Sequence, residues 1–269
     1  MRMATKLRKY LKLYLKLAKF SASLEMEYRF SFILEVFVEV AFFFVTLFGM
    51  RVVYWNVSEI AGWHFNELLV LLGVNMVFTE LVLGFVFIYN LRELPFKIAK
   101  GDLDMILLKP INSQFSVSLW RPYFALFPSA LAGIVVAVVG FTRGGFAFNP
   151  IMFLPFLLIF SCGLVIAYSI GMLISTLSMW FINATPLPML AQQLLFVARN
   201  PYSVFSGAWR IIFLTFLPIA FMASFPASTL LGKLELWWLP ASVALAVVFL
   251  WGSNVFWKFA LKKYSGASS

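Results

Sequence analysis

The chain has 269 residues, of which 62% are apolar or aromatic and 12% are charged, and its net charge is +10. Soluble globular proteins are typically 45–50% apolar and about 25% charged, so this composition argues against a water-soluble enzyme, a disordered chain and a secreted disulfide scaffold. The basic excess is compatible with nucleic-acid binding, but in so apolar a chain it more often orients membrane helices. We therefore predict an all-α, multi-pass membrane protein that binds no nucleic acid.

Residues 1–30 predict a basic amphipathic helix rather than a signal peptide. Basic residues interrupt every apolar run here, and no small-residue cleavage site follows. On a helical wheel Tyr10 and Leu17 fall on one face, while Lys9 and Lys16 fall on another. We expect this helix to lie in the inner membrane interface, and a solvated basic tail is the alternative.

A membrane helix needs about 20 mostly apolar residues to cross the hydrocarbon core. The fifth candidate is the weakest, because Pro218 interrupts it and Pro226 follows closely. The six predicted spans are residues 31–50, 68–90, 117–140, 151–180, 210–230 and 237–259.

The distribution of basic residues predicts the orientation of these spans. If the N-terminus is cytoplasmic, all but three of the 21 lysines and arginines fall in inner segments. The three in outer segments are Arg51, Arg143 and Lys233. This asymmetry follows the positive-inside rule, so we place both termini, including the tail 261–269, in the cytoplasm.

The inner loop of residues 91–114 predicts two short helices. Pro95 suits the first turn of one helix and Gly101 suits its end. Asp102 or Asp104 is expected to cap a second helix that ends before Pro110. The loop also carries more apolar side chains than a solvated connector needs, so we expect them to be buried on the membrane or on another protein. These apolar residues are Phe96, Ile98, Leu103, Ile106 and Leu107.

Acidic residues inside predicted spans cost free energy on insertion, so each calls for a reason. Glu35 and Glu39 share one face of the first span, and Glu80 lies near the middle of the second with Asn75 close to its face. These groups either line a hydrophilic translocation path or form structural pairs with Arg29, Arg121 or a neighbouring helix. We favour pairing, because Arg29 and Arg121 are assigned to the same leaflet.

The fourth span carries small residues four positions apart, a pattern that permits close helix packing. These are Gly163, Ala167, Gly171 and Ser175. The lone cysteine, Cys162, is interpreted as an apolar filler and the lone histidine, His64, as an outer-loop surface residue. They leave too few ligands for a Cys/His metal site. No catalytic constellation and no phosphate-binding loop is found, so we predict no enzyme activity and no cofactor in this chain.

Several motifs together resemble a known family. The block Gly101-Asp-Leu-Asp104 followed by Leu107-Leu-Lys-Pro-Ile111 is similar to the hallmark of the ABC-2 family of ABC-transporter permeases. Three weaker similarities accompany it along nearly the whole chain. These are Tyr28-Arg29 at the first span, Leu217-Pro-Ile-Ala-Phe221 in the fifth and Phe225-Pro-Ala227 after it.

This resemblance implies a permease subunit, most often of an exporter, in a bacterial cytoplasmic membrane. It pairs with a second permease chain, identical or related, and with two copies of a separate ATPase that binds ATP and Mg. Residues 1–30 correspond to the family's elbow helix. The family's short re-entrant elements between spans five and six would fall in segment 224–236, which is too brief for a full hairpin unless it takes in the end of span five. The ATPase is expected to dock on the loop between spans two and three. The matching residues are Pro95, Phe96, Ile98, Gly101, Asp102, Leu103, Asp104, Leu107, Lys109 and Pro110.

An ion- or proton-coupled secondary transporter is the alternative function. It would use Glu35, Glu39 and Glu80 as a relay. Secondary transporters often contain internal repeats with matched broken helices, but the two halves of this sequence show no convincing repeat. The substrate is not encoded in any motif of the chain.

Overall fold

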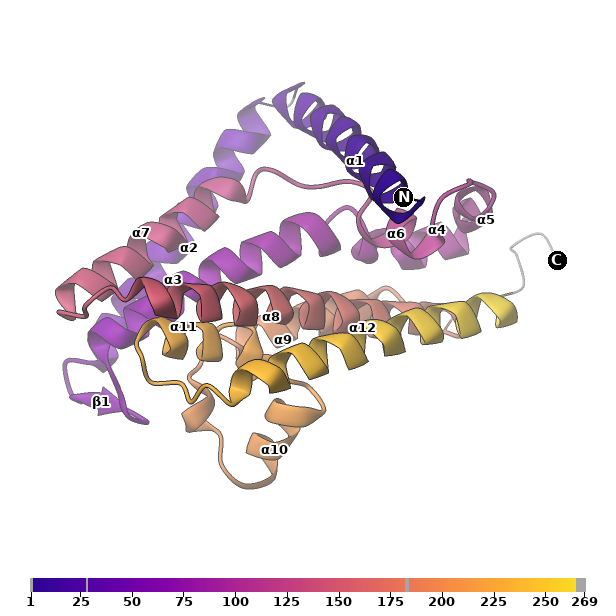
Figure 1. The fold of residues 1–269 in the computed structure, drawn as a ribbon. Helices are drawn as coiled ribbons and strands as arrows, with labels where there is room; N and C mark the ends of the chain where they lie inside the picture. The colour runs from indigo at the N-terminus through magenta and orange to yellow at the C-terminus, as the bar shows by residue number, and fades with distance from the viewer. Residues whose placement is uncertain (1, 28, 182–183, 265–269) are drawn as a thin grey trace.

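The structure is a computed structural model that describes residues 2–27, 29–181 and 184–264. Tyr28 and residues 265–269 of the predicted tail lie outside the described residues. The fold is helical apart from one small hairpin (Figure 1). The longer helices are α1 (Arg2–Glu27), α2 (Arg29–Val53), α3 (Phe65–Val82), α7 (Phe127–Arg143), α8 (Pro150–Thr176), α9 (Pro186–Val197) and α12 (Trp238–Lys263).

Shorter elements connect these helices. The strands β1 (Glu59–Ile60) and β2 (Trp63–His64) pair antiparallel, with Glu59 opposite His64. The short α-helices are α4 (Leu94–Ala99), α5 (Asp102–Leu107), α6 (Ser113–Ser118), α10 (Gly207–Thr215) and α11 (Ser224–Leu230). One π-helical segment, η1 (Leu83–Phe87), extends α3, and the 3-10 segments are η2 (Leu91–Glu93), η3 (Leu177–Met179), η4 (Tyr202–Val204) and η5 (Ile219–Phe221).

Four helical stretches of the described chain are long and apolar enough to cross a membrane. They are Ile33–Val53, Phe65–Phe87, Pro150–Met179 and Trp238–Lys263. Each falls on a span expected from the sequence, namely the first, second, fourth and sixth. Helices α7 and α9 are also apolar but shorter. The chain is therefore an all-α protein with several membrane-spanning helices.

The third expected span, 117–140, differs from the structure. Residues 113–118 form α6 instead, and the apolar helix α7 begins only at Phe127. Proline explains this difference, because Pro122 lacks an N–H donor and disfavours helical backbone at Arg121. Pro128 then occupies the first turn of α7, where no donor is needed.

The fifth expected span, 210–230, is not one helix. It is divided among the end of α10, the segment η5 and α11. Pro218, at φ −69° and ψ 61°, separates α10 from η5. The apolar helix α9 lies between the expected fourth and fifth spans, where the sequence predicts an inner loop, and it packs on α8. Arg199, just after α9, therefore does not sit in the loop we expected.

Helix α3 packs closely along α7 because glycines line their contact. A Cβ atom on Gly73 would lie 2.4 Å from the backbone nitrogen of Ala137, and one on Gly140 would lie 2.7 Å from the backbone oxygen of Asn66. Gly133 faces Gly73 across the same contact. Small residues permit this approach of two backbones, which strengthens their van der Waals packing.

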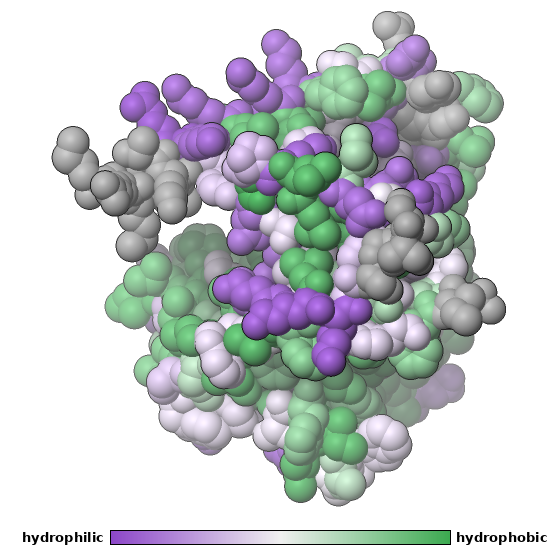
Figure 2. All heavy atoms as spheres, turned by 90° about the vertical axis from the view of Figure 1, so that its right-hand side faces the viewer, coloured by the Kyte–Doolittle hydropathy of each residue, from purple (hydrophilic) through white to green (hydrophobic). Residues whose placement is uncertain are grey.

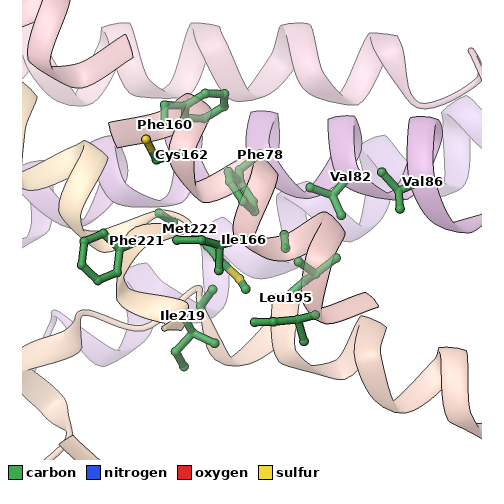
Figure 3. Close-up of a cluster of buried hydrophobic side chains, with 14 of the residues drawn as sticks. Phe78, Val82, Val86, Phe160, Cys162, Ile166, Leu195, Ile219, Phe221 and Met222 are labelled. Atoms are coloured by element: carbon green, nitrogen blue, oxygen red, sulfur yellow. The ribbon is translucent and has the colours of Figure 1, made fainter. Parts of the chain in front are cut away.

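The largest apolar core lies where α3, α8, α9 and η5 meet (Figure 3). Phe78 of α3 and Ile166 of α8 are fully buried there, and Leu195 of α9 and Ile219 of η5 pack beneath them. Cys162 is buried in this core, and it is a free cysteine. The core thus joins elements from both halves of the sequence.

The two ends of the fold differ in their elements (Figure 1). Helices α4, α5 and α6 lie together with the N-terminal end of α1 and the C-terminal end of α12, and we call this the α4–α6 end. Strand β1 and the C-terminal end of α7 lie at the opposite end, which we call the hairpin end. Figure 2 looks onto the α4–α6 end, where hydrophilic residues gather across the top and centre with hydrophobic groups between them.

Candidate functional site

The helix pair α4–α5 forms the expected pair of short helices at the α4–α6 end. Pro95 occupies the first turn of α4, and Gly101, at φ +79°, separates the two helices in a left-handed conformation that favours glycine. Neither Asp102 nor Asp104 caps α5, which differs from our expectation. Gly101 is the N-cap residue, so both acids fall inside the first turn, where they interact favourably with the helix dipole.

The exposed apolar residues of α4–α5 are only partly those expected. Leu103 is completely buried in the core, so it faces the protein rather than a partner. Ile98 and Leu107 are partly buried and pack against the same core. The exposed apolar side chains are those of Phe96, Met105 and Leu108, of which Leu108 is 80% exposed. The sequence identified the loop, but it missed Met105 and Leu108, because burial depends on which helix face packs inward.

Polar residues surround this apolar surface. Asp102, Lys109 and Pro110 are exposed, and the ammonium of Lys109 lies 4.6 Å from the ring centroid of Trp120. Burial lowers the pKa of Lys97 below its ordinary value, and the negative charges of Glu93 and Asp102 partly oppose this shift. The surface of α4–α5 therefore combines three exposed apolar groups with charges of both signs.

Helix α6 ties this surface to three long helices. The hydroxyl of Tyr10 in α1 accepts a 3.0 Å hydrogen bond from the backbone nitrogen of Asn112, which caps α6. Two residues of α12 reach the other side of α6. Trp257 donates from Nε1 to Ser113 Oγ at 3.1 Å, and Asn254 donates to Gln114 Oε1 at 3.1 Å. Ser118 Oγ lies 3.0 Å from the hydroxyl of Tyr168 in α8.

A second connection joins the chain just before α4 to the chain just after α6, and we call it the Asn90 clamp. Asn90 is fully buried, and its Nδ2 donates to the backbone oxygens of Phe85 and Arg121, each at 2.9 Å. Its Oδ1 accepts from the backbone nitrogen of Arg121 at 2.9 Å. The backbone nitrogen of Tyr123 also donates to the oxygen of Gly84 at 2.8 Å, within the π-helical segment. The clamp thus provides hydrogen-bond partners for backbone groups that would otherwise be unpaired, both in the π-helical segment and in the non-helical chain before α7.

Acidic residues of α1 and α2 pair with the chain that precedes α7. Tyr123 donates a hydrogen bond from its hydroxyl to Glu35 of α2. The carboxylate of Glu25 in α1 accepts from the backbone nitrogen of Phe124, at 3.1 Å to Oε1 and 3.0 Å to Oε2. The guanidinium of Arg121 lies 3.9 Å from the ring centroid of Tyr89. The side chain of Arg29, one of the two arginines proposed as partners, lies outside the described residues.

Deeper in the fold, Glu39 of α2 and Glu80 of α3 lie close enough to Arg199 for their charges to interact. The charges of Glu39 and Arg199 both act on Glu80, although no Glu80–Arg199 contact lies within 4.0 Å. Glu80 Oε2 and Asn75 Nδ2 are buried and have no hydrogen-bond partner among the described residues. The sequence missed Arg199 because the assignment of its segment to an inner loop concealed it. We call these residues, with Asn75, the polar centre.

The small residues of α8 face η5 and the π-helical extension of α3. A Cβ on Gly163 would lie 2.3 Å from the backbone oxygen of Phe221, and one on Gly171 would lie 2.6 Å from the ring of Phe87. Ala167 and Ser175 are buried between them. This stripe therefore brings α8 close to both neighbours.

The described part of the chain has no group of three or more His, Cys, Asp or Glu residues that could hold a metal ion. The side chain of His64 is exposed at the hairpin.

Comparison with known proteins gives one match. The profile of the ABC-2 family transporter proteins matches residues 40–268. No curated protein and no solved structure matches the chain significantly. The matched range includes α4–α5, the Asn90 clamp and all described residues from α3 to α12.

Proposed function

Because the chain belongs to the ABC-2 family of transporter proteins, we propose that it is the permease subunit of an ATP-driven exporter in a bacterial cytoplasmic membrane. The family's membrane domain carries no nucleotide-binding domain of its own, so the energy comes from a separate ATPase that binds ATP and Mg. Two ATPase copies would act on two permease chains, either identical or related. The α4–α6 end would then face the cytoplasm.

The observation that carries this proposal is the exposed apolar surface of α4–α5. Phe96, Met105 and Leu108 project from the end of the fold, while Leu94 and Leu103 fix the same two helices in the core. Three exposed apolar side chains do not stabilise a solvated connector, whereas their burial under a bound partner contributes favourable binding free energy. We propose that the ATPase docks here, with Asp102, Lys109 and Pro110 at the polar rim.

The transmission route from this surface would run through α6. Movement of α4–α5 would reach α12 through Trp257 and Asn254, α8 through Tyr168 and α1 through Tyr10. Because these contacts are hydrogen bonds and ring packing rather than flexible loops, α6 would pass displacement directly to the long helices.

The polar centre is our candidate for the translocation path. A buried carboxylate oxygen without a partner, as at Glu80, is costly in a membrane helix and is typical of a pathway that holds water or a polar substrate. Glu35 has a different role, because its contact with Tyr123 supports a structural pairing. Transport by the variant Glu80→Gln should therefore change more than transport by Glu35→Gln.

The docking proposal is tested by co-purification. A tagged chain carrying Phe96→Ser and Leu108→Ser is expressed with its ATPase, and the ATPase retained on the tag is quantified. We expect retention to fall at least about tenfold, because burying one such side chain is worth about 1.5–3 kcal/mol. Val204→Ser is the matched control, since Val204 is an exposed apolar residue of η4, outside α4–α5.

Equal retention by the double variant and the control would refute docking on α4–α5.

Transport measured in proteoliposomes distinguishes an ATP-driven permease from an ion- or proton-coupled secondary transporter. ATP-dependent flux that requires the ATPase supports the permease, whereas flux driven by a pH gradient without ATP would refute an ATP-driven mechanism.

A further inference from the structure

A groove between α2, α3 and α7 is not used by the proposed transport mechanism. It has a volume of about 760 Å³. Its walls are aliphatic and aromatic, with Phe44 and Phe48 from α2 and Val135 and Val139 from α7. Leu69 of α3, which is buried against Val136, forms the floor. The volume lies within the range of about 300–1,000 Å³ that is common for ligand sites.

Two arginines lie in the same groove. Arg51 is in the last turn of α2, Arg143 ends α7, and both line the groove and are exposed. The C-terminal end of α7 lies at the hairpin end (Figure 1). The guanidinium of Arg51 also lies 5.0 Å from the ring centroid of Phe65, so the charge sits over an apolar surface. Basic residues on this side are few, which makes two of them in one groove informative.

Neither arginine has a carboxylate partner among the described residues. The ion pairs within 4.0 Å there are Lys233–Glu67 and His64–Glu59, and no acidic residue lines the groove. Asn66, which also lines it, donates to the backbone oxygen of Arg143 at 3.2 Å. The two guanidinium groups are therefore available to an anion from outside the chain.

We propose that this groove binds an anionic phospholipid. Guanidinium groups match the geometry of phosphate oxygens, and the apolar walls match an acyl chain. A soluble anion would explain the arginines but not the walls, and an uncharged hydrophobic ligand would explain the walls but not the arginines. The phosphate lies at Arg51 and Arg143, and the acyl chain runs between α2 and α7 toward the middle of the bilayer. This inference does not depend on the ATPase.

Lipid binding to the purified chain tests the proposal. Native mass spectrometry is used to measure binding of phosphatidylglycerol and phosphatidylcholine with identical acyl chains. The variant Arg51→Gln with Arg143→Gln should bind phosphatidylglycerol about 25-fold more weakly, since one basic charge near a lipid surface is worth about fivefold. Its binding of phosphatidylcholine should change little. The matched control is Arg92→Gln with Arg210→Gln, which removes two exposed arginines outside the groove.

A second variant tests the walls separately from the charges. Val135→Trp fills the groove from a position that is 61% exposed, so it does not disturb the core. It should weaken binding of both lipids. An unchanged preference for phosphatidylglycerol in the arginine variant, an equal loss in the control, or full binding by Val135→Trp would overturn the proposal. Quantitative disulfide cross-linking of Val135→Cys between two copies in native membranes would also overturn it, because a second protein chain would then cover the groove.

Discussion

Trp257 in α12 donates a 3.1 Å hydrogen bond from its indole Nε1 to the hydroxyl of Ser113, the first residue of α6. The indole is 2% exposed, so this bond is made away from water. It fixes α6 to α12, the last helix of the chain's described part. The segment that follows α4–α5 is therefore attached to a predicted membrane span by a specific contact.

Replacing Ser113 with Ala should destabilise the protein by about 1–3 kcal/mol, because the buried indole N–H loses its acceptor. Thermal unfolding of the purified chain in detergent measures this loss. Trp257→Phe removes the indole donor. Adding Ser113→Ala to Trp257→Phe should therefore lower stability much less than Ser113→Ala does in the unchanged protein. Equal costs of Ser113→Ala in both backgrounds would show that the two residues are not coupled.

Replacing Gly73 with Ala should lower stability by at least about 1–3 kcal/mol, the usual cost of overpacking a core. The new Cβ would lie 2.4 Å from backbone atoms of Gly133 and Ala137, which cannot move aside as a side chain does. Gly252→Ala is the control, because no atom lies within 4 Å of a Cβ there. That substitution should be neutral or stabilising, since alanine favours a helix. A similar loss in both variants would contradict the close packing of α3 on α7.

The pair Glu67–Lys233 should matter more to stability than the pair Glu59–His64. Lys233 Nζ lies 2.6 Å from the Oε2 atom of the buried Glu67, which also accepts from the backbone nitrogen of His64 at 3.1 Å. Glu67→Gln should cost about 1–3 kcal/mol, less than a fully buried pair because Lys233 is partly exposed. Glu59→Gln should cost less than about 1 kcal/mol. Unfolding temperatures of the two variants test this order, and equal shifts would contradict it.

Stability should depend on pH through Glu25. Burial raises the pKa of Glu25 above its ordinary value of 4.5, while the N–H groups of Phe124 and Ala125 and the charge of Arg121 lower it. The folded protein therefore holds this proton more tightly than the unfolded chain. The resulting stability is fully present below pH 4.5 and is lost as the pH rises through the raised pKa.

Glu25→Gln imitates the protonated form, and its carbonyl oxygen still accepts from Phe124. The unfolding temperature of this variant, compared with that of the unchanged protein, should rise between pH 4 and pH 8. Glu27→Gln is the control, because Glu27 is an exposed acid two residues away. A difference that stays constant with pH would show that Glu25 does not titrate as described.

The sequence predicted features that depend on local chemistry. Pro95 and Gly101 defined the boundaries of α4, and long apolar runs located four spans, because each signal lies within a few neighbouring residues. The side of each helix that packs inward was not predictable in the same way. Leu103 and Leu108 are both leucines of one short segment, yet one is completely buried and the other is 80% exposed. That difference arises from packing on distant elements.

Long-range partners account for the other differences. Arg199 comes within range of the charges of Glu39 and Glu80 only because the chain turns back after α8, and no spacing rule connects residues so far apart. The break at Pro218 could be predicted from the sequence, because a proline acts on its immediate neighbours. The packing of α9, which lies before the expected fifth span, could not be predicted in this way. The twelve-residue α9 is too short to satisfy the length rule on its own.

The Asn90 clamp holds the two ends of the segment 91–120 next to each other, at hydrogen bonds of 2.9 Å between Asn90 and Arg121. A segment whose ends meet is a closed loop, so the exposed side chains of α4–α5 can be exchanged while the clamp and the buried Leu94 and Leu103 hold the segment in place. We expect the proposed ATPase docking to be confined to these exchangeable side chains. Exchange of these side chains between related permeases should then change which ATPase binds, while the membrane helices keep their arrangement.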